Sequence, residues 1–379
     1  MRGEIAEAAG CGVAILAGVA VALGGARADG PLPADGPSPA PEVRVLVHRG
    51  PGPLRLGVRG TPPFEVRVAG GAVLVPGRGR VESLRLGPGP VRVGDLWYRG
   101  TLEVRPGSDG LDVINRVDLE SYVAGTLMRE VYPAWEDAVL RAQAVVARTY
   151  ALHEMQRHRD RHFDVTADAR SQVYGGISAE MPRAWEAVEA TRGEYLAFGG
   201  EPILAVYHSA SGGRTASSEE VWGEALPYLV SREVAGEEPS PASRWREELS
   251  AEELREALAE LGIEVGRPTE LRVERRSRSG RAASLRVRGA RGEARLSARA
   301  LRRALGSSRV RSTRFEVRGE GDRFVIEGAG AGHGVGMSQW GARAMAARGA
   351  DYRAILRAFY PRTTLERLGS AQVAAEGSP

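Results

Sequence analysis

Between residues 42 and 106, apolar and polar residues alternate in short runs, and glycine or proline separates each run from the next. The runs EVRVLVH, LRLGV, FEVRVAG, SLRLG and LWYRGTLEVR have the two-residue period of half-buried strands. The pattern predicts a small all-β module over residues 42–108. Its residues point to no chemistry, so a binding or spacer role and a purely structural role are equally open.

The pattern changes after this module. Apolar side chains recur at helical spacing from Trp135 to Thr149. Pro133 suits the first position of a helix, so we expect a long helix from this residue with one buried face. Further strands and amphipathic helices follow it. The chain is therefore expected to be α+β, with a mixed domain over residues 109–368 and a sub-domain at about 245–325.

Residues 12–25 form an apolar run that is short for a membrane span and leads into Ala-Arg-Ala at 26–28. This small-x-small pattern is typical of a signal-peptidase site. We expect residues 1–28 to be a signal peptide that exports the protein to the periplasm, cell envelope or medium, and a buried core helix is the alternative. A Pro/Gly-rich linker at 29–41 and a disordered tail at 369–379 are expected to flank the folded part.

Cysteine occurs once, at Cys11, ahead of the apolar run. Cleavage after Ala28 would remove it, which would exclude disulfides, a cysteine nucleophile and thiolate metal ligands. All 52 basic residues are arginine, and they are interleaved with 48 acidic residues for a net charge of +4. A nucleic-acid-binding protein usually carries a basic stripe. None is present, so nucleic acid is not an expected partner.

Three stretches resemble the SpoIID/LytB family, which groups the sporulation stage II protein D with amidase enhancers that act on peptidoglycan. They are LESYVAGTLMREVYPAWEDAVLRAQAVVARTYAL at 119–152, VYHSASGGRT at 206–215, and the stretch at 328–364 that includes GHGVGMSQWGARAMA. The resemblance covers residues 111–368. It implies a SpoIID-like mixed domain in which the long helix follows a catalytic glutamate.

The resemblance implies two activities. SpoIID-like members are lytic transglycosylases, which cut the glycan between N-acetylmuramic acid (MurNAc) and N-acetylglucosamine (GlcNAc), whereas LytB-like members enhance amidases. This chain is therefore expected to be a peptidoglycan lytic transglycosylase, or alternatively a non-catalytic enhancer of an N-acetylmuramoyl-L-alanine amidase. A structural envelope protein is the third possibility. Peptidoglycan glycan strands are the expected ligand, with a cell-wall amidase as a further partner in the enhancer case.

The resemblance places the essential glutamate at Glu130. An ordinary glycosidase needs two carboxylates, but a lytic transglycosylase can use one, because the C6 hydroxyl of MurNAc is already tethered near C1. The acid must be protonated at the working pH, which requires surroundings that raise its pKa. Tyr132 and Trp135 are candidates for an apolar wall beside it. Without the resemblance, a solvated loop glutamate is the simpler interpretation.

The loop after the expected strand at 202–210 is rich in hydroxyl and glycine residues, which would let sugar hydroxyls reach the backbone. Ser211 lacks the Gly-x-Ser-x-Gly context of a hydrolase nucleophile. Glycine at every second position from 328 to 336 does not fit a dinucleotide loop and is interpreted as close backbone packing that presents His333. A satisfied structural histidine is the alternative. The predicted substrate-binding residues are Gln143, Arg148, Tyr207, His208, Ser209, Ser211, His333, Ser338 and Gln339.

Some relatives bind zinc through Cys and His residues just after the long helix. The corresponding positions in this chain are Thr166, Arg170 and Ser171. His158 and His162 have the spacing of two ligands on one helix face, but arginines surround them and no thiolate is available. We therefore expect no metal and no other cofactor.

Overall fold

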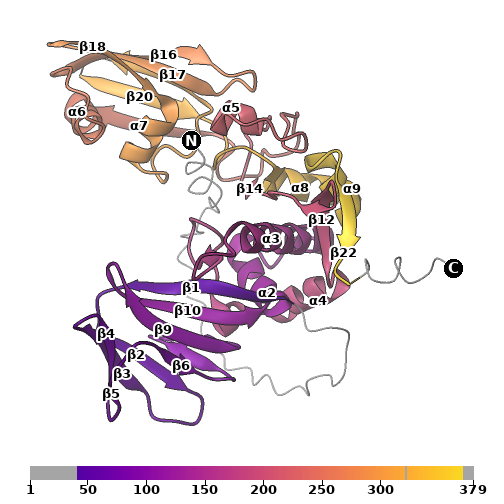
Figure 1. The fold of residues 1–379 in the computed structure, drawn as a ribbon. Coiled ribbons are helices and arrows are strands. Elements are labelled where there is room, and N and C mark those ends of the chain that lie inside the picture. The colour runs from indigo at the N-terminus through magenta and orange to yellow at the C-terminus, as the bar shows by residue number, and fades with distance from the viewer. Residues whose placement is uncertain (1–40, 321, 370–379) are drawn as a thin grey trace. The chain divides into compact units, whose positions relative to one another are not determined.

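The computed structural model describes residues 41–320 and 322–369 (Figure 1). The predicted signal peptide, most of the predicted linker and the tail from residue 370 lie outside the described residues. The described chain contains helices and several small sheets, and ten strands precede its first helix, which confirms the α+β class. In the described part, no helix is both long and apolar enough to span a membrane.

The described chain divides into two compact units, each assembled from separate segments. The first unit contains Trp135–Ala142 and Ala205–Thr363. The second unit contains the described residues before residue 135, Gln143–Leu204, and the described residues from 364 onward. Each unit is described by itself below.

The second unit begins with strands that form two sheets. One sheet has the order β11-β1-β10-β9-β6, and the other has the order β5-β4-β3-β2-β7-β8. The predicted boundary between residues 108 and 109 falls inside the antiparallel hairpin of β9 and β10. The strands are β1 (Glu42–Gly50), β2 (Leu54–Val58), β3 (Phe64–Ala69), β4 (Ala72–Val75), β5 (Gly79–Val81), β6 (Leu84–Leu86), β7 (Val91–Val93), β8 (Leu96–Tyr98), β9 (Thr101–Gly107), β10 (Gly110–Asp118) and β11 (Val165–Thr166).

Strand β10 runs directly into helix α2 (Leu119–Glu130). Asp118 caps this helix, because its Oδ1 accepts a hydrogen bond of 3.0 Å from the backbone N–H of Ser121. The helix that carries the resemblance is therefore fixed at its first turn, and Glu130 is its last residue.

The long helix α3 (Asp137–Arg157) begins four residues later than predicted. Pro133 lies in the preceding turn, where its carbonyl accepts a hydrogen bond from Arg183. The first helical hydrogen bonds run from the N–H groups of Val139 and Leu140 to the carbonyl of Glu136. From residue 142 to residue 152 every side is buried, so the helix is enclosed and does not present a single buried face as expected.

Arg148 is completely buried in the second unit, and its contacts give it a structural role. Its Nε and Nη2 donate to the carboxylate of Glu120 in α2 at 3.0 and 2.5 Å. Its Nη1 donates to the backbone carbonyl of Glu194 at 3.0 Å. The side chain predicted to bind substrate thus joins α2 and α3 to strand β12 (Glu194–Phe198), with none of its surface exposed.

The remaining elements of the second unit complete this core. Strand β12 lies between β13 and β22 in a three-stranded antiparallel sheet, so residues 364–367 pair with a strand from the middle of the sequence. The elements are a 3-10 helix η1 (Gly176–Ala179), helix α4 (Pro182–Ala190), β13 (Glu201–Pro202) and β22 (Thr364–Arg367).

Part of the first unit carries a hydrophobic core of its own, within the region expected to form a sub-domain. Leu254, Leu285, Leu301 and Phe324 are completely buried in it. Two antiparallel sheets, ordered β15-β20-β19 and β16-β17-β18, and two helices contribute to this core (Figure 1). The elements are β15 (Trp245–Ser250), α6 (Ala251–Glu260), β16 (Pro268–Arg276), β17 (Ala282–Gly289), β18 (Gly292–Ser297), α7 (Ala298–Leu305), β19 (Phe315–Glu320) and β20 (Arg323–Gly328).

The rest of the first unit consists of short strands and helices around the other stretches that carry the resemblance. They are β14 (Tyr207–His208), α5 (Ser218–Trp222), β21 (Met337–Ser338), α8 (Gln339–Ala346) and α9 (Tyr352–Phe359). Only two residues of the expected strand at 202–210 pair with β21, because most of the segment runs as irregular backbone.

Replacing Arg148 with leucine should lower the free energy of unfolding by about 3–5 kcal/mol, because Glu120 would keep a buried charge without its partner. Urea unfolding followed by circular dichroism measures this loss. Arg192→Leu is the control, since its ion pair with Glu189 is about half exposed and should be worth at most about 1 kcal/mol. Equal losses in the two variants would contradict the structural role of Arg148.

Candidate functional site

Glu130 lies at the carboxyl end of α2 and is only 5% exposed. Its Oε1 accepts a hydrogen bond of 2.8 Å from the backbone N–H of Val173. Burial is the main cause that raises the pKa values of Tyr122 and Tyr150, and the negative charge of Glu130 contributes to both. The carboxyl group is therefore held among buried aromatic side chains and is not a solvated loop glutamate.

The segment that contains Val173 packs along α2. The hydroxyl of Tyr122 donates to Oε1 of Gln172 at 3.1 Å. A Cβ atom at Gly125 would lie 2.6 Å from the ring of Tyr174, so only glycine lets this ring approach the helix. These contacts hold the backbone that binds Glu130, and sequence reasoning assigned no role to Tyr122, Gly125 or Tyr174. The motif VAGTL contained the signal, because a mid-helix glycine often marks close packing.

The loop that corresponds to the zinc-binding positions of some relatives is closed by hydrogen bonds. The N–H of Thr166 donates to Oγ of Ser171 at 3.1 Å, and Oδ1 of Asp168 accepts the hydroxyl of Thr166 at 3.0 Å. Nδ1 of His158 lies 2.7 Å from a backbone carbonyl, to which it donates. These residues do not fit a zinc ion. Across residues 41–320 and 322–369, no group of three or more His, Cys, Asp or Glu residues could hold a metal.

In the first unit, the second and third stretches that carry the resemblance lie side by side. Strands β14 and β21 are parallel, with Tyr207 opposite Met337 and His208 opposite Ser338. Ala210 and Ala331 exchange backbone hydrogen bonds of 3.2 and 2.8 Å. The fold thus brings together most of the predicted substrate-binding residues from positions more than a hundred residues apart.

Alternate glycines make this approach possible. Gly336 has φ = 71°, and a Cβ atom there would lie 1.9 Å from the carbonyl oxygen of Val206. Gly330 has φ = 79°, and a Cβ atom there would lie 2.6 Å from the carbonyl oxygen of Ala210. A side chain at either position would meet both backbone strain and a clash. The interpretation of the glycine run as close backbone packing is confirmed.

A buried carboxylate that the sequence did not reveal, that of Glu237, joins the two stretches. It is 5% exposed and accepts hydrogen bonds from the N–H and the hydroxyl of Ser211 at 2.8 and 2.6 Å, and from the N–H of Gly213 at 2.9 Å. The hydroxyl of Ser338 also donates to it. The hydroxyl groups of Ser211 and Ser338, predicted to bind substrate, therefore position the loops. No local pattern distinguishes Glu237 from Glu238 beside it.

His208 and His333 contact each other, with ring centroids 5.6 Å apart, and Trp222 lies 5.5 Å from His333. Nδ1 of His208 donates to the carbonyl of Val335 at 3.0 Å, whereas Nδ1 of His333 accepts the N–H of Val335 at 3.0 Å. Burial, followed by the charge of Arg281, lowers the pKa of His208 from 6.5 to about 3. Burial also holds the pKa of His333 well below 6.5. Both rings are therefore neutral near pH 7.

Arg281 reaches this site from the segment between β16 and β17. Its side chain is almost fully buried, and its Nη2 donates to the carbonyl of Ser211 at 2.9 Å. Burial lowers its pKa to about 10. A Cβ atom at Gly334 would lie 2.2 Å from the same Nη2, which explains the glycine at this position. Sequence reasoning missed Arg281, because nothing distinguishes it among the many arginines of the chain.

The other predicted site residues lie in both units. Gln143 is completely buried in the second unit. In the first unit, Tyr207 and Gln339 are both 4% exposed, and the carbonyl of half-buried Ser209 accepts the N–H of Trp340 at 3.0 Å.

The two aromatic residues expected beside Glu130 also belong to different units. Tyr132 is half-buried in the second unit. Trp135 is in the first unit, where its ring packs edge-on against Trp340 at 5.0 Å. Arg343 lies over both of these indole rings. Tyr122 and Tyr150, two buried aromatic side chains of the second unit, interact electrostatically with Glu130.

Comparison with known proteins adds to this geometry. A family model described as "Stage II sporulation protein" matches residues 107–198, which include Glu130. An uncharacterized protein of Brachyspira hyodysenteriae is 33% identical over 266 residues, which cover 69% of this chain and 70% of that protein. Stage II sporulation protein D of Bacillus amyloliquefaciens is 30% identical, over 65% of this chain and 74% of that protein. The chain belongs to the SpoIID/LytB family.

Two further matches bear on the function of this family member. A domain of unknown function (DUF8618) matches residues 218–336, which include Glu237, Arg281 and His333. The amidase enhancer of Bacillus subtilis is 29% identical over 64% of this chain, but the alignment covers only 40% of the enhancer. The protein is thus a cell-wall protein of the SpoIID and amidase-enhancer group. Its relatives include proteins named stage II sporulation protein D and a protein named amidase enhancer.

The neutral state of His208 predicts a pH dependence of stability. Because its folded pKa is depressed, the unfolded state binds an extra proton as the pH falls below 6.5, and this destabilises the fold. From pH 7.5 to pH 5 the loss attributable to His208 should be about 2 kcal/mol. His208→Asn keeps a donor for the carbonyl of Val335 and should lose less stability over this range. Urea unfolding at the two pH values measures the difference.

His162→Asn provides the control for this measurement, because His162 is exposed. This variant should retain the full pH dependence of the unaltered protein. If His208→Asn also retained it, the protonation of His208 would not contribute to the acid sensitivity of the fold.

Proposed function

We propose that this SpoIID/LytB protein is an exported peptidoglycan lytic transglycosylase with Glu130 as its catalytic residue. The observation that carries the proposal is the carboxyl group of Glu130, which is buried at the end of α2 and fixed by the N–H of Val173. It lies within the region that matches the stage II sporulation protein model. A buried, positioned carboxyl group suits proton transfer at a sugar bond.

One carboxyl group accounts for both proton transfers. The protonated acid of Glu130 gives its proton to the glycosidic oxygen, and the bond from this oxygen to C1 of MurNAc breaks. The resulting carboxylate then removes the proton from the C6 hydroxyl of the same sugar, whose oxygen bonds to C1. Glu130 regains its proton, and the product carries a 1,6-anhydro ring. No water and no second carboxylate are consumed, because the nucleophile is part of the substrate.

The burial of Glu130 supports the acid role. A carboxylate is costly away from water, so an enclosed site favours the neutral acid that the first step needs. The backbone N–H of Val173 donates to one carboxyl oxygen and orients the group.

We assign glycan contacts in the first unit to His333 and Trp222. Both side chains are half-buried and their rings are in contact, which provides an aromatic surface of the kind that sugars pack against. Peptidoglycan lies outside the cytoplasm, which agrees with the export signal proposed for residues 1–28.

The second candidate is a non-catalytic enhancer of an N-acetylmuramoyl-L-alanine amidase. The name of the amidase enhancer of Bacillus subtilis, a relative at 29% identity, favours it. In this case Glu130 would only accept hydrogen bonds from the glycan, and the partner would be a cell-wall amidase.

Glu130→Gln separates the two candidates. The amide keeps the size and the hydrogen-bonding groups of Glu130 but has no proton to transfer, so glycan cleavage should fall by at least about a hundredfold. Mass spectrometry of the soluble products from purified glycan strands, intact and peptide-stripped, measures cleavage through 1,6-anhydro-MurNAc ends. Glu154→Gln is the matched control, because Glu154 is equally buried in the second unit. It should retain cleavage.

Three other results would reject the lytic transglycosylase. Equal cleavage by Glu130→Gln and the unaltered protein would exclude Glu130 as the acid. Products with reducing ends would indicate hydrolysis and a second carboxylate. Absence of products, together with binding to isolated sacculi and stimulation of an added amidase, would establish the enhancer.

A further inference from the structure

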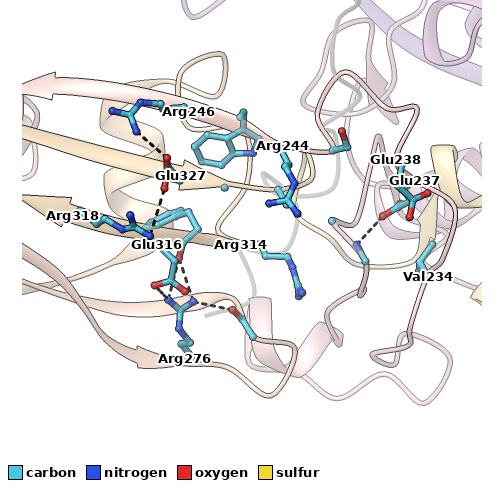
Figure 2. Close-up of a pocket in the computed structure, with 18 residues that line it drawn as sticks. Val234, Glu237, Glu238, Arg244, Arg246, Arg276, Arg314, Glu316, Arg318 and Glu327 are labelled. Atoms are coloured by element: carbon cyan, nitrogen blue, oxygen red, sulfur yellow. Dashed lines mark hydrogen bonds and ion pairs between the residues drawn. The ribbon is translucent and has the colours of Figure 1, made fainter.

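A pocket of about 960 Å³ opens in the first unit, within and beside the region that matches the domain of unknown function (Figure 2). One side consists of strands β15, β19 and β20, and the other of the loops around Gly212 and Glu237. Its volume is at the upper end of the range for small-molecule sites. Every residue that lines the pocket belongs to the first unit, whereas Glu130 belongs to the second.

Five arginines line the pocket, and three of them are neutralised by carboxylates. Glu327 forms ion pairs with Arg246 at 2.9 Å and with Arg318 at 3.9 Å. Glu316 forms one with Arg276 at 2.5 Å. These three arginines account for the dashed contacts on the sheet side of Figure 2.

Arg244 and Arg314 are different, because neither forms an ion pair with any described residue. The one side-chain hydrogen bond of Arg314 runs from Nη1 to the carbonyl of Ser279 at 2.8 Å, and the exposed side chain of Arg244 has none within the described chain. Figure 2 shows both guanidinium groups between the sheet and the loop of Glu237. Most of their N–H donors therefore have no acceptor among the residues that the structure describes.

Neither nearby carboxylate pairs with these two arginines. Glu237 lines the pocket, but the hydrogen bonds that its oxygens accept come from Ser211, Gly213 and Ser338. Glu238 is exposed, so solvent screens its charge. The pocket thus holds two arginines with free donors beside an apolar wall of Trp245 and Phe315.

The wall of the pocket is rigid. The indole N–H of Trp245 donates to the carbonyl of Gly330 at 3.0 Å, and a Cβ atom at Gly328 would lie 2.2 Å from the ring. The ring of Phe315 packs edge-on against Trp245 at 6.4 Å. Two guanidinium groups without ion pairs, next to a fixed aromatic surface, fit a ligand that has a carboxylate and is otherwise uncharged.

We propose that this pocket binds a carboxylate of peptidoglycan between Arg244 and Arg314. The identity of the ligand rests on the proposed function, since peptidoglycan supplies such groups in two forms. A stem peptide carries free carboxylates, and a peptide-stripped strand exposes the lactyl carboxylate of MurNAc. The region of unknown function thus becomes a recognition module for the acidic part of the substrate.

The test is direct binding of three probes to the full protein by isothermal titration calorimetry. The probes are a synthetic stem tripeptide, a peptide-stripped glycan oligomer and inorganic phosphate. At least one carboxylate probe should bind, and Arg244→Gln should weaken it by about tenfold, the value of one charge-assisted hydrogen bond. Arg314→Gln should have a similar effect, and rising salt should weaken binding because the site is open to solvent.

Arg303→Gln is the matched control, because this substitution removes the same charge from an exposed residue of α7 that does not line the pocket. It should bind like the unaltered protein. Because the tripeptide has no glycosidic bond, its binding is measured independently of cleavage, and failure of the catalytic role of Glu130 can be told apart from failure of carboxylate binding. Binding of the tripeptide alone would support the stem-peptide source, and binding of the stripped oligomer alone would support the lactyl source.

Two results would overturn the proposal. Equal affinity of Arg244→Gln, Arg314→Gln and Arg303→Gln for the carboxylate probe would show that the pocket is not its site. Binding of phosphate without either carboxylate probe would identify a phosphate site instead. Because Arg244 is exposed and has no described partner, its substitution leaves the fold intact, and either result is interpretable.

Discussion

The buried carboxylate of Glu237 is the interaction on which the first unit depends. A charge away from water is tolerated only when its oxygens accept enough hydrogen bonds, and here the donors come from Ser211, Gly213 and Ser338. Satisfying one side chain therefore fixes two loops that are remote in the sequence. Glu120 has the same function in the second unit, where Arg148 and the N–H of Gly193 surround it. In both units, side chains that we propose to act on the glycan are attached to loops and helices that a buried charge holds.

Local patterns made much of the fold predictable. The two-residue period of the first strands and the alternate glycines before His333 each depend on neighbours in the sequence, and the structure confirms both. The predicted start of α3 was wrong. Pro133 is compatible with a first helical turn, but the sequence does not reveal that a hydrogen bond from Arg183 holds it in the turn before the helix. Glu130 itself was identified through the resemblance to a family, since no local pattern separates it from other glutamates.

The roles of buried polar residues were the least predictable part. Arg148 pairs with a residue 28 positions away, and Ser338 with one 101 positions away. A motif shows that a serine or arginine is polar but not whether its partner is a sugar or a buried carboxylate. For the same reason no sequence pattern pointed to Arg281 or Glu237, although both bind Ser211, in the loop that follows His208.

The four-residue strand β22 has a consequence for the order in which the protein forms. Tyr195 of β12 and Glu366 of β22 are 171 positions apart, yet they face each other across one small sheet of the second unit. A chain that emerges from its amino end can build the early strands and both long helices at once. The edge of β12 that pairs with β22 stays uncovered until residues 364–367 have been synthesised. A nascent or truncated chain consequently carries an open strand edge, the feature by which incomplete proteins associate with one another.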